Sequence, residues 1–188
     1  MIDEQRLALF VMLGQSASIA IEASPELVSP QSLHLSGAYD LAEIMPEVVR
    51  NSVEAAEAYR LFFVFEGYLR EFVVDALSAS DKENWWASVP KDVQEEVAKL
   101  EQNEETKSWM ALGSRDKSSL MTYPQLLRVI DQCWKSHFED LLRDKTLVHQ
   151  ARLIGHLRNT ICHMSNISAE ELERVRQTMR DWFRRIAP

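Results

Sequence analysis

Glycine, proline and cysteine are scarce in this chain, whose 188 residues include five Gly, six Pro and two Cys. So few turn-forming residues argue against a β-rich protein, because a sandwich or barrel needs many tight turns. Cys133 and Cys162 show no CxxC or Cys/His spacing, which argues against a zinc site and a disulfide framework. Leu, Ala, Glu and Arg are plentiful instead, and they favour helices.

A membrane-spanning hydrophobic run is also missing. The most apolar stretch, residues 7–21, is too short and is interrupted by Gln15, Ser16 and Ser18. The N-terminus reads Met-Ile-Asp-Glu, which is acidic where a secretory signal carries positive charge. We therefore expect a cytoplasmic protein that has no membrane partner.

An overall positive charge is lacking, since the net charge is −8. Residues 1–94 carry six Lys and Arg against fifteen Asp and Glu, a balance of −9. Residues 95–188 carry fifteen against fourteen, or +1, and within them residues 141–188 carry nine against five, or +4. This distribution disfavours a broad basic groove for nonspecific nucleic-acid binding. It permits contact with RNA at a small cleft in the last quarter of the chain.

Hydrophobic periodicity predicts an all-α protein, namely an up-and-down helical bundle with an N-terminal helical appendage. The expected helices cover residues 4–22, 46–78, 90–112, 123–142, 145–162 and 168–186.

The first of these helices is expected to bury a face made of Leu7, Phe10, Val11 and Leu13. Residues 23–40 contain Pro, Gly and several Ser without a helical or strand period, so we expect a connector and no β-hairpin. The predicted domains are therefore residues 1–40, a helix with its connector, and residues 41–188, the bundle.

Two short motifs carry the functional signal. RNTICH, residues 158–163, places Arg, Asn and His in the order R-N-x-x-x-H at the end of a predicted helix. This order resembles the R-[NHD]-x(3–5)-H signature of the HEPN superfamily. Upstream, FEGYLR at 65–70 followed by WW at 85–86 is similar to the FE-x-x-LR…WW segment of one HEPN subfamily.

The resemblance implies a helical-bundle endoribonuclease that needs no metal and no other cofactor. It carries Arg158 and His163 over as the catalytic pair and Asn159 as a polar positioning residue. The upstream acidic residue maps to Glu66, with Arg70 as a supporting residue one turn later. This chemistry is sound, because His transfers protons near neutral pH and a guanidinium clamps phosphate oxygens. The 2′-OH of the RNA would be the nucleophile.

Partners and roles follow from the same resemblance. RNA would be bound at a local cleft between the two copies of a homodimer, each of which supplies one motif. The role would be that of a toxin, a phage-defence or an RNA-processing effector, with an antitoxin or a larger effector protein as a further partner. Met164 and Ser165 follow His163 where one toxin subfamily has x-Tyr, so control through that tyrosine is not expected.

The helix over residues 145–162 has a polar face beside its buried stripe. On it lie His149, Arg152, His156 and Asn159, and His163 follows at the helix end. Arg158 is about 100° round the helix from Asn159. We expect Arg152 and His156 to contribute weakly to substrate binding. His149, His156 and His163 recur every seven residues, about 10.5 Å apart, which is too far to share a metal ion.

Three alternatives remain open from the sequence. Arg158 and His163 also fit a helix-end ion pair and a C-capping His, which are common in bundles. Glu66 lies among apolar residues and needs a partner, which is either Arg158 or the nearer Arg70. Finally, the chain fits a noncatalytic module that dimerises or docks a partner through residues 4–22.

Overall fold

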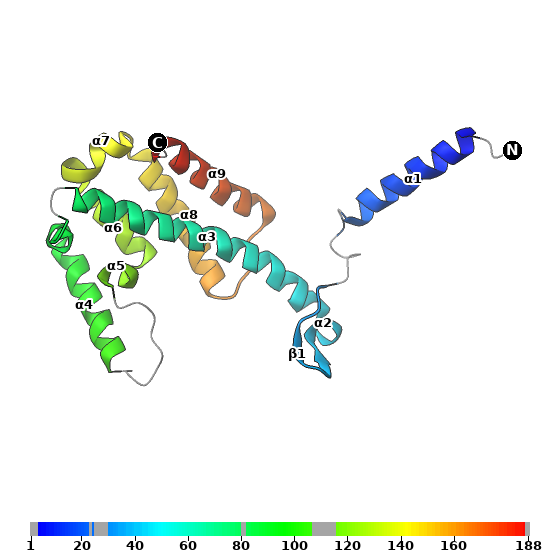
Figure 1. The fold of residues 1–188 in the computed structure, drawn as a ribbon, viewed down its shortest axis with the longest axis horizontal. Coiled ribbons are helices and arrows are strands. Elements are labelled where there is room, and N and C mark those ends of the chain that lie inside the picture. The colour runs from blue at the N-terminus through cyan, green and yellow to red at the C-terminus, as the bar shows by residue number, and fades with distance from the viewer. Residues whose placement is uncertain (1–3, 23, 25–29, 80–81, 107–115, 187–188) are drawn as a thin grey trace. The chain divides into compact units, whose positions relative to one another are not determined.

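The computed structural model of the protein describes residues 4–22, 24, 30–79, 82–106 and 116–186 (Figure 1). The chain divides into two compact units, residues 1–54 and 55–188. The boundary falls inside the long helix α3 (Pro46–Ser78). The domain boundary expected at residue 40 stays a prediction. Among the described residues, no helix has the length and apolarity needed to cross a membrane.

The first unit contains helix α1 (Glu4–Glu22), a small hairpin of β1 (His34–Ser36) and β2 (Tyr39–Asp40), and helix α2 (Leu41–Ile44). The expectation that residues 23–40 hold no hairpin was therefore wrong. The two strands are too short and too exposed to leave an alternating apolar pattern. A side chain holds them instead: the Asp40 carboxylate accepts hydrogen bonds of 2.9 Å from the main-chain N–H groups of Leu33 and Ala42.

Helix α1 does not bury the expected face. Within its own unit, the side chains of Leu7, Phe10, Val11 and Leu13 are 49–75% exposed. The reason is visible in the sequence, because residues 9–13 are all apolar and surround the helix rather than forming one stripe. A helix that is apolar all round has no single face to direct inward.

Helix α3 supplies part of the core of the second unit through its residues 58–77. Its Pro46 occupies the first helical position, where proline is favoured because the N–H there has no helical partner. Core residues then recur at spacings of four and three along the helix and form one buried stripe: Ala58, Phe62, Phe65, Leu69, Phe72 and Ala76. This stripe matches the predicted helix and confirms it.

The remaining elements complete the helical bundle. They are η1 (Trp85–Ser88), α4 (Lys91–Glu105), α5 (Lys117–Leu120), α6 (Tyr123–Gln132), η2 (Trp134–Phe138), α7 (Glu139–Leu142), α8 (Thr146–Cys162) and α9 (Ala169–Ile186). The described residues are mostly helical, which confirms the all-α class. The expected helix over 90–112 is confirmed over α4, and its residues 107–112 lie outside the described residues.

The helix expected over 123–142 is interrupted by the wide π-turn η2, which follows Cys133. Within and around η2, four core residues follow one another at a spacing of four: Ile130, Trp134, Phe138 and Leu142. An α-helix has 3.6 residues per turn, so this spacing would rotate each successive side chain out of the core. The wider π-turn compensates for this rotation, and all four side chains are buried.

Aromatic side chains join the helices of the second unit. The Phe65 ring contacts Tyr123 of α6 and Trp182 of α9, with ring centroids 6.2 and 5.9 Å apart. Two hydrogen bonds attach these rings to α8: the Tyr123 hydroxyl donates to the Ala151 carbonyl at 2.6 Å, and the Trp182 indole donates to the Leu147 carbonyl at 3.1 Å. Helix α8 is thereby fixed against α6 and α9.

Candidate active site

The carboxylate of Glu66 binds two guanidinium groups from different parts of the chain. Its Oε1 accepts a hydrogen bond of 3.2 Å from Nη2 of Arg70, one turn further along α3. Its Oε2 accepts one of 3.4 Å from Nη2 of Arg158 on α8. Both partners that the sequence left open are therefore present at the same time.

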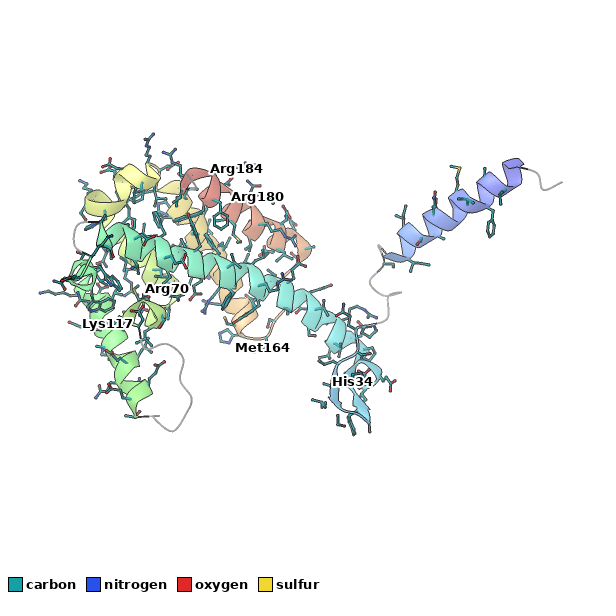
Figure 2. The ribbon with its side chains drawn as sticks, viewed as in Figure 1. His34, Arg70, Lys117, Met164, Arg180 and Arg184 are labelled. Carbon is teal, nitrogen blue, oxygen red and sulfur yellow. The ribbon has the colours of Figure 1, made fainter. Side chains whose placement is uncertain are left out.

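Arg70 is also held by main-chain oxygens. Its Nε donates to the Ser118 carbonyl at 2.7 Å and its Nη2 donates to the Met121 carbonyl at 3.0 Å. These carbonyls belong to the end of α5, beside the position of Arg70 that Figure 2 labels. Arg70 thus ties α3 to α5, and its fork is largely occupied. No pattern in the sequence indicates this contact, because its acceptors are main-chain atoms.

Arg158 is the more available of the two cations. Its side chain is 28% exposed, while that of Arg70 is 23% exposed and also donates to two main-chain carbonyls. One carboxylate facing two guanidiniums leaves a local charge of +1. A partly buried positive group of this kind interacts with an anion more strongly than a fully solvated one does. The arrangement suits a phosphate oxygen that would reach Arg158.

The same charges act on Tyr123. Burial raises the pKa of its hydroxyl above the usual range, and the nearby negative charge of Glu66 raises it further. The phenol therefore stays protonated and donates its hydrogen bond to Ala151. Tyr123 therefore holds α6 against α8 rather than acting as a base.

A cavity of about 260 Å³ lies between α3 and α8 at this cluster. Its lining includes Tyr59, Phe63, Glu66 and Arg70 from α3, and Arg158 and Cys162 from α8. Gly67 also lines it, and a Cβ placed on Gly67 would meet nothing within 4 Å. The glycine therefore leaves open space here and is not required for close packing.

The other expected site residues on α8 face a second cavity, of about 330 Å³. Tyr123 and Arg128 of α6 line it together with Arg152, Gly155, His156 and Asn159 of α8. Arg152 and His156, which were expected to contribute weakly to substrate binding, thus share a cavity with Asn159. Arg158 lines the other cavity.

Acidic partners reduce the positive charge of this second cavity. Arg128 donates to Glu96 at 2.7 Å, and Arg152 donates to Asp131 at 3.1 Å. The Glu66–Arg158 cavity is thus the better candidate for a phosphate.

His163 occupies the C-cap of α8 and is exposed. Its main-chain N–H donates to the Asn159 carbonyl at 3.0 Å, while its ring is absent from the lining of both cavities described above. The next residue, Met164, has a left-handed φ of 58° on the turn that Figure 2 labels. Main-chain bonds from Met164 to Ile161 and from Ser165 to Thr160 close this turn.

The sequence left open that Arg158 and His163 serve only as a helix-end ion pair and a C-capping residue. Both features are present, since Arg158 forms an ion pair and His163 occupies the C-cap of α8. Neither feature removes the side chain of Arg158 or His163 from solvent, so neither conflicts with a catalytic role.

Trp85 and Trp86 are half-buried against the core, with ring centroids 5.4 Å apart. Within the described ranges, no three His, Cys, Asp or Glu side chains are grouped to hold a metal ion.

Sequence reasoning missed the aromatic part of the site. Tyr59 and Phe63 lie one turn apart on α3, and Phe63 precedes Glu66 by three residues. This spacing places all three side chains on one side of the helix, and it was available in the sequence.

Comparison with known proteins identifies the family. No curated protein and no solved structure matches the chain. The family model described as Swt1-like HEPN matches residues 60–187, a range that includes Glu66, Arg70 and the whole RNTICH segment. HEPN domains form a family of proposed ribonucleases. Because the match covers most of its length, this chain belongs to the Swt1-like HEPN family.

Proposed function

We propose that this protein is a metal-independent endoribonuclease that acts as a homodimer. The observation that carries the proposal is the Glu66–Arg158 ion pair, which holds a guanidinium at a cavity beside the exposed end of α8. Family membership supports the same class of activity.

Cleavage would use the RNA's own hydroxyl. The 2′-oxygen attacks the adjacent phosphorus and loses its proton, and the bond from phosphorus to the 5′-oxygen breaks. The leaving oxygen takes up a proton, so the products are a 2′,3′-cyclic phosphate and a 5′-hydroxyl. His163 carries a proton in this scheme, Arg158 stabilises the charge on the phosphorane, and Asn159 positions the motif.

A second copy of the chain completes the proposed site. One Arg and one His are few groups for two proton transfers and charge stabilisation, and two copies facing each other double them. The RNA would lie at the shared cleft. The same proposal includes a role as a toxin, a phage-defence or an RNA-processing effector. It also includes an antitoxin or a larger effector protein as a partner.

The direct test is an RNA-cleavage assay on the purified protein with EDTA present. We expect cleavage to persist in EDTA, to spare DNA, and to leave 2′,3′-cyclic phosphate ends. A matched RNA with 2′-O-methyl groups should resist cleavage, because it lacks the nucleophile. Products with 5′-phosphates, or activity that EDTA abolishes, would rule out this mechanism.

The exposed helix α1 favours a second candidate function, that of a noncatalytic docking module. Residues 7–21 carry no charge, and the large apolar side chains among them are exposed within their unit. Contiguous apolar surface of this kind marks interaction sites. Deleting residues 1–24 separates the two functions: a docking module loses its partner, whereas the proposed nuclease keeps its RNA-cleaving activity.

A further inference from the structure

Two aromatic rings at the edge of the Glu66–Arg158 cavity have no role in the core. Tyr59 and Phe63 are 56% and 69% exposed, whereas their neighbours Ala58 and Phe62 are buried. The two ring centroids are 6.1 Å apart and the ring planes are inclined by 31°. Helix α3 therefore turns one stripe inward and presents this aromatic pair to solvent.

The aromatic pair and the Arg158 guanidinium, which Glu66 holds, face the same space. Tyr59 and Phe63 line the cavity of about 260 Å³ together with Arg158 and Arg70. Flat apolar surfaces thus form one part of its wall and a positive group forms another. An unpaired nucleotide has the complementary chemistry, since it combines a flat base with a negatively charged phosphate.

We propose that Tyr59 and Phe63 stack a base of single-stranded RNA whose neighbouring phosphate is bound by Arg158. This inference rests on the proposed function in that the ligand is RNA, and it adds how the strand is held. Aromatic side chains bind unpaired bases through their faces, and every base has such a face. The pair would therefore select unpaired over double-stranded RNA, with little preference for sequence.

Charge favours RNA over a protein surface as the occupant. The centre of a protein interface is typically depleted of Asp, Glu and Lys, and Arg is the charged residue that is enriched there. Here the rings adjoin one carboxylate and two guanidiniums, which together carry a charge of +1. Single-strand binding sites combine aromatic rings with positive groups in this way.

The test measures the affinity of the full-length protein for a fluorescent 2′-O-methyl RNA oligomer, which binds without being cleaved. Phe63→Ala and Tyr59→Ala should each weaken binding by about 5- to 100-fold, the usual contribution of one stacked base. Phe63→Leu should weaken it similarly, because Leu keeps the apolar contact and loses the ring. Val64→Ala is the matched control: Val64 is an exposed apolar residue of α3 outside the cavity lining, and its removal should change nothing.

An abasic oligomer with the same sugar–phosphate chain distinguishes stacking from indirect effects. It should bind the wild type and the ring variants with equal affinity, because it offers no base. A loss that persists on the abasic oligomer, wild-type affinity in the ring variants, or no binding by the wild type would each overturn the inference. So would a change of molar mass in Phe63→Ala with unaltered RNA affinity, which would assign the rings to self-association.

The inference and the proposed function can fail separately. If the rings are needed for RNA binding but unmodified RNA is not cleaved, the stacking inference is supported and the proposed nuclease activity is overturned. Metal-independent cleavage with ring variants that bind and cleave normally would do the reverse.

Discussion

Glu66 Oε2 on α3 accepts a hydrogen bond of 3.4 Å from Nη2 of Arg158 on α8, 92 residues later in the chain. The same carboxylate holds Arg70, which is itself fixed by the carbonyls of Ser118 and Met121. A row of contacts thus leads from α5 through α3 to the Arg of the RNTICH segment. The orientation of Arg158 depends on groups far from it in sequence.

Replacing Glu66 by Gln should therefore affect both stability and the orientation of Arg158. We expect Glu66→Gln to lower the free energy of unfolding by about 1–3 kcal/mol, because it removes the charge from two hydrogen-bonded ion pairs. Urea denaturation would measure the change. Glu71→Gln, at an exposed carboxylate on the same helix, is the control and should be nearly neutral. Equal stabilities for the two variants would contradict the prediction.

His163 is expected to carry the proton transfer. His163→Ala should lower the rate of RNA cleavage by about 10²–10⁴ through the loss of acid–base assistance. The fold should be retained, since the side chain is exposed. His149→Ala removes an exposed imidazole from the same helix and should leave the rate unchanged. An active His163→Ala protein would exclude the assigned role.

Arg158→Lys tests whether charge alone is enough. We expect the ion pair with Glu66 to survive and the activity to be lost, because an ammonium group lacks the planar fork that binds two phosphate oxygens. Circular dichroism would verify the fold and the cleavage assay the loss. Arg174→Lys, on the exposed surface of α9, should retain full activity. Full activity in Arg158→Lys would show that a point charge suffices.

Asp131 links α6 to the start of α8, and its contribution should depend on pH. Lys145 and then Arg152 bind its carboxylate and hold its pKa below the ordinary 3.8. A lowered pKa gives stability that is present above the ordinary value and is lost as the pH falls through the folded-state value.

Asp131→Asn should therefore lower stability by less than about 1 kcal/mol at pH 7, because the pairs are partly exposed. The difference from wild type should shrink in acid, when unfolding is measured at pH 7 and at pH 3. Asp140→Asn, at an exposed carboxylate on α7, serves as the control. A difference that grows in acid would contradict the sign.

Two helical glycines should respond differently to alanine. Gly67→Ala should raise the free energy of unfolding by about 0.5–1 kcal/mol, because alanine is the better helix former and its Cβ meets nothing within 4 Å. In Gly155→Ala the Cβ would lie 3.2 Å from Cε1 of Tyr123, so crowding should offset the gain. Thermal unfolding would rank the two variants, and a Gly155→Ala protein as stable as Gly67→Ala would contradict this reasoning.

Much of the bundle is predictable from sequence, because each long helix has a regular apolar stripe. The Arg158–Asn159 relationship was predictable as well, since neighbours on a helix point about 100° apart. The structure accordingly gives them different cavities. The hairpin was missed because its strands are very short. The turn η2 was missed because single spacings of four also occur in the apolar stripe of an ordinary α-helix. The binding of Arg70 by carbonyls could not be predicted, since main-chain acceptors occur at every residue.

The placement of Arg158 and Asn159 at different cavities along α8 limits the path of a bound strand. This helix is a partition with Arg158 on one side and Asn159 on the other. A strand in contact with both sides must cross the partition. The exposed turn at Met164 provides a crossing at the end of the helix, and His163 stands beside it. A strand on this path would meet three groups of the motif in turn: Arg158, which would bind a phosphate, His163, which would carry a proton, and the amide of Asn159.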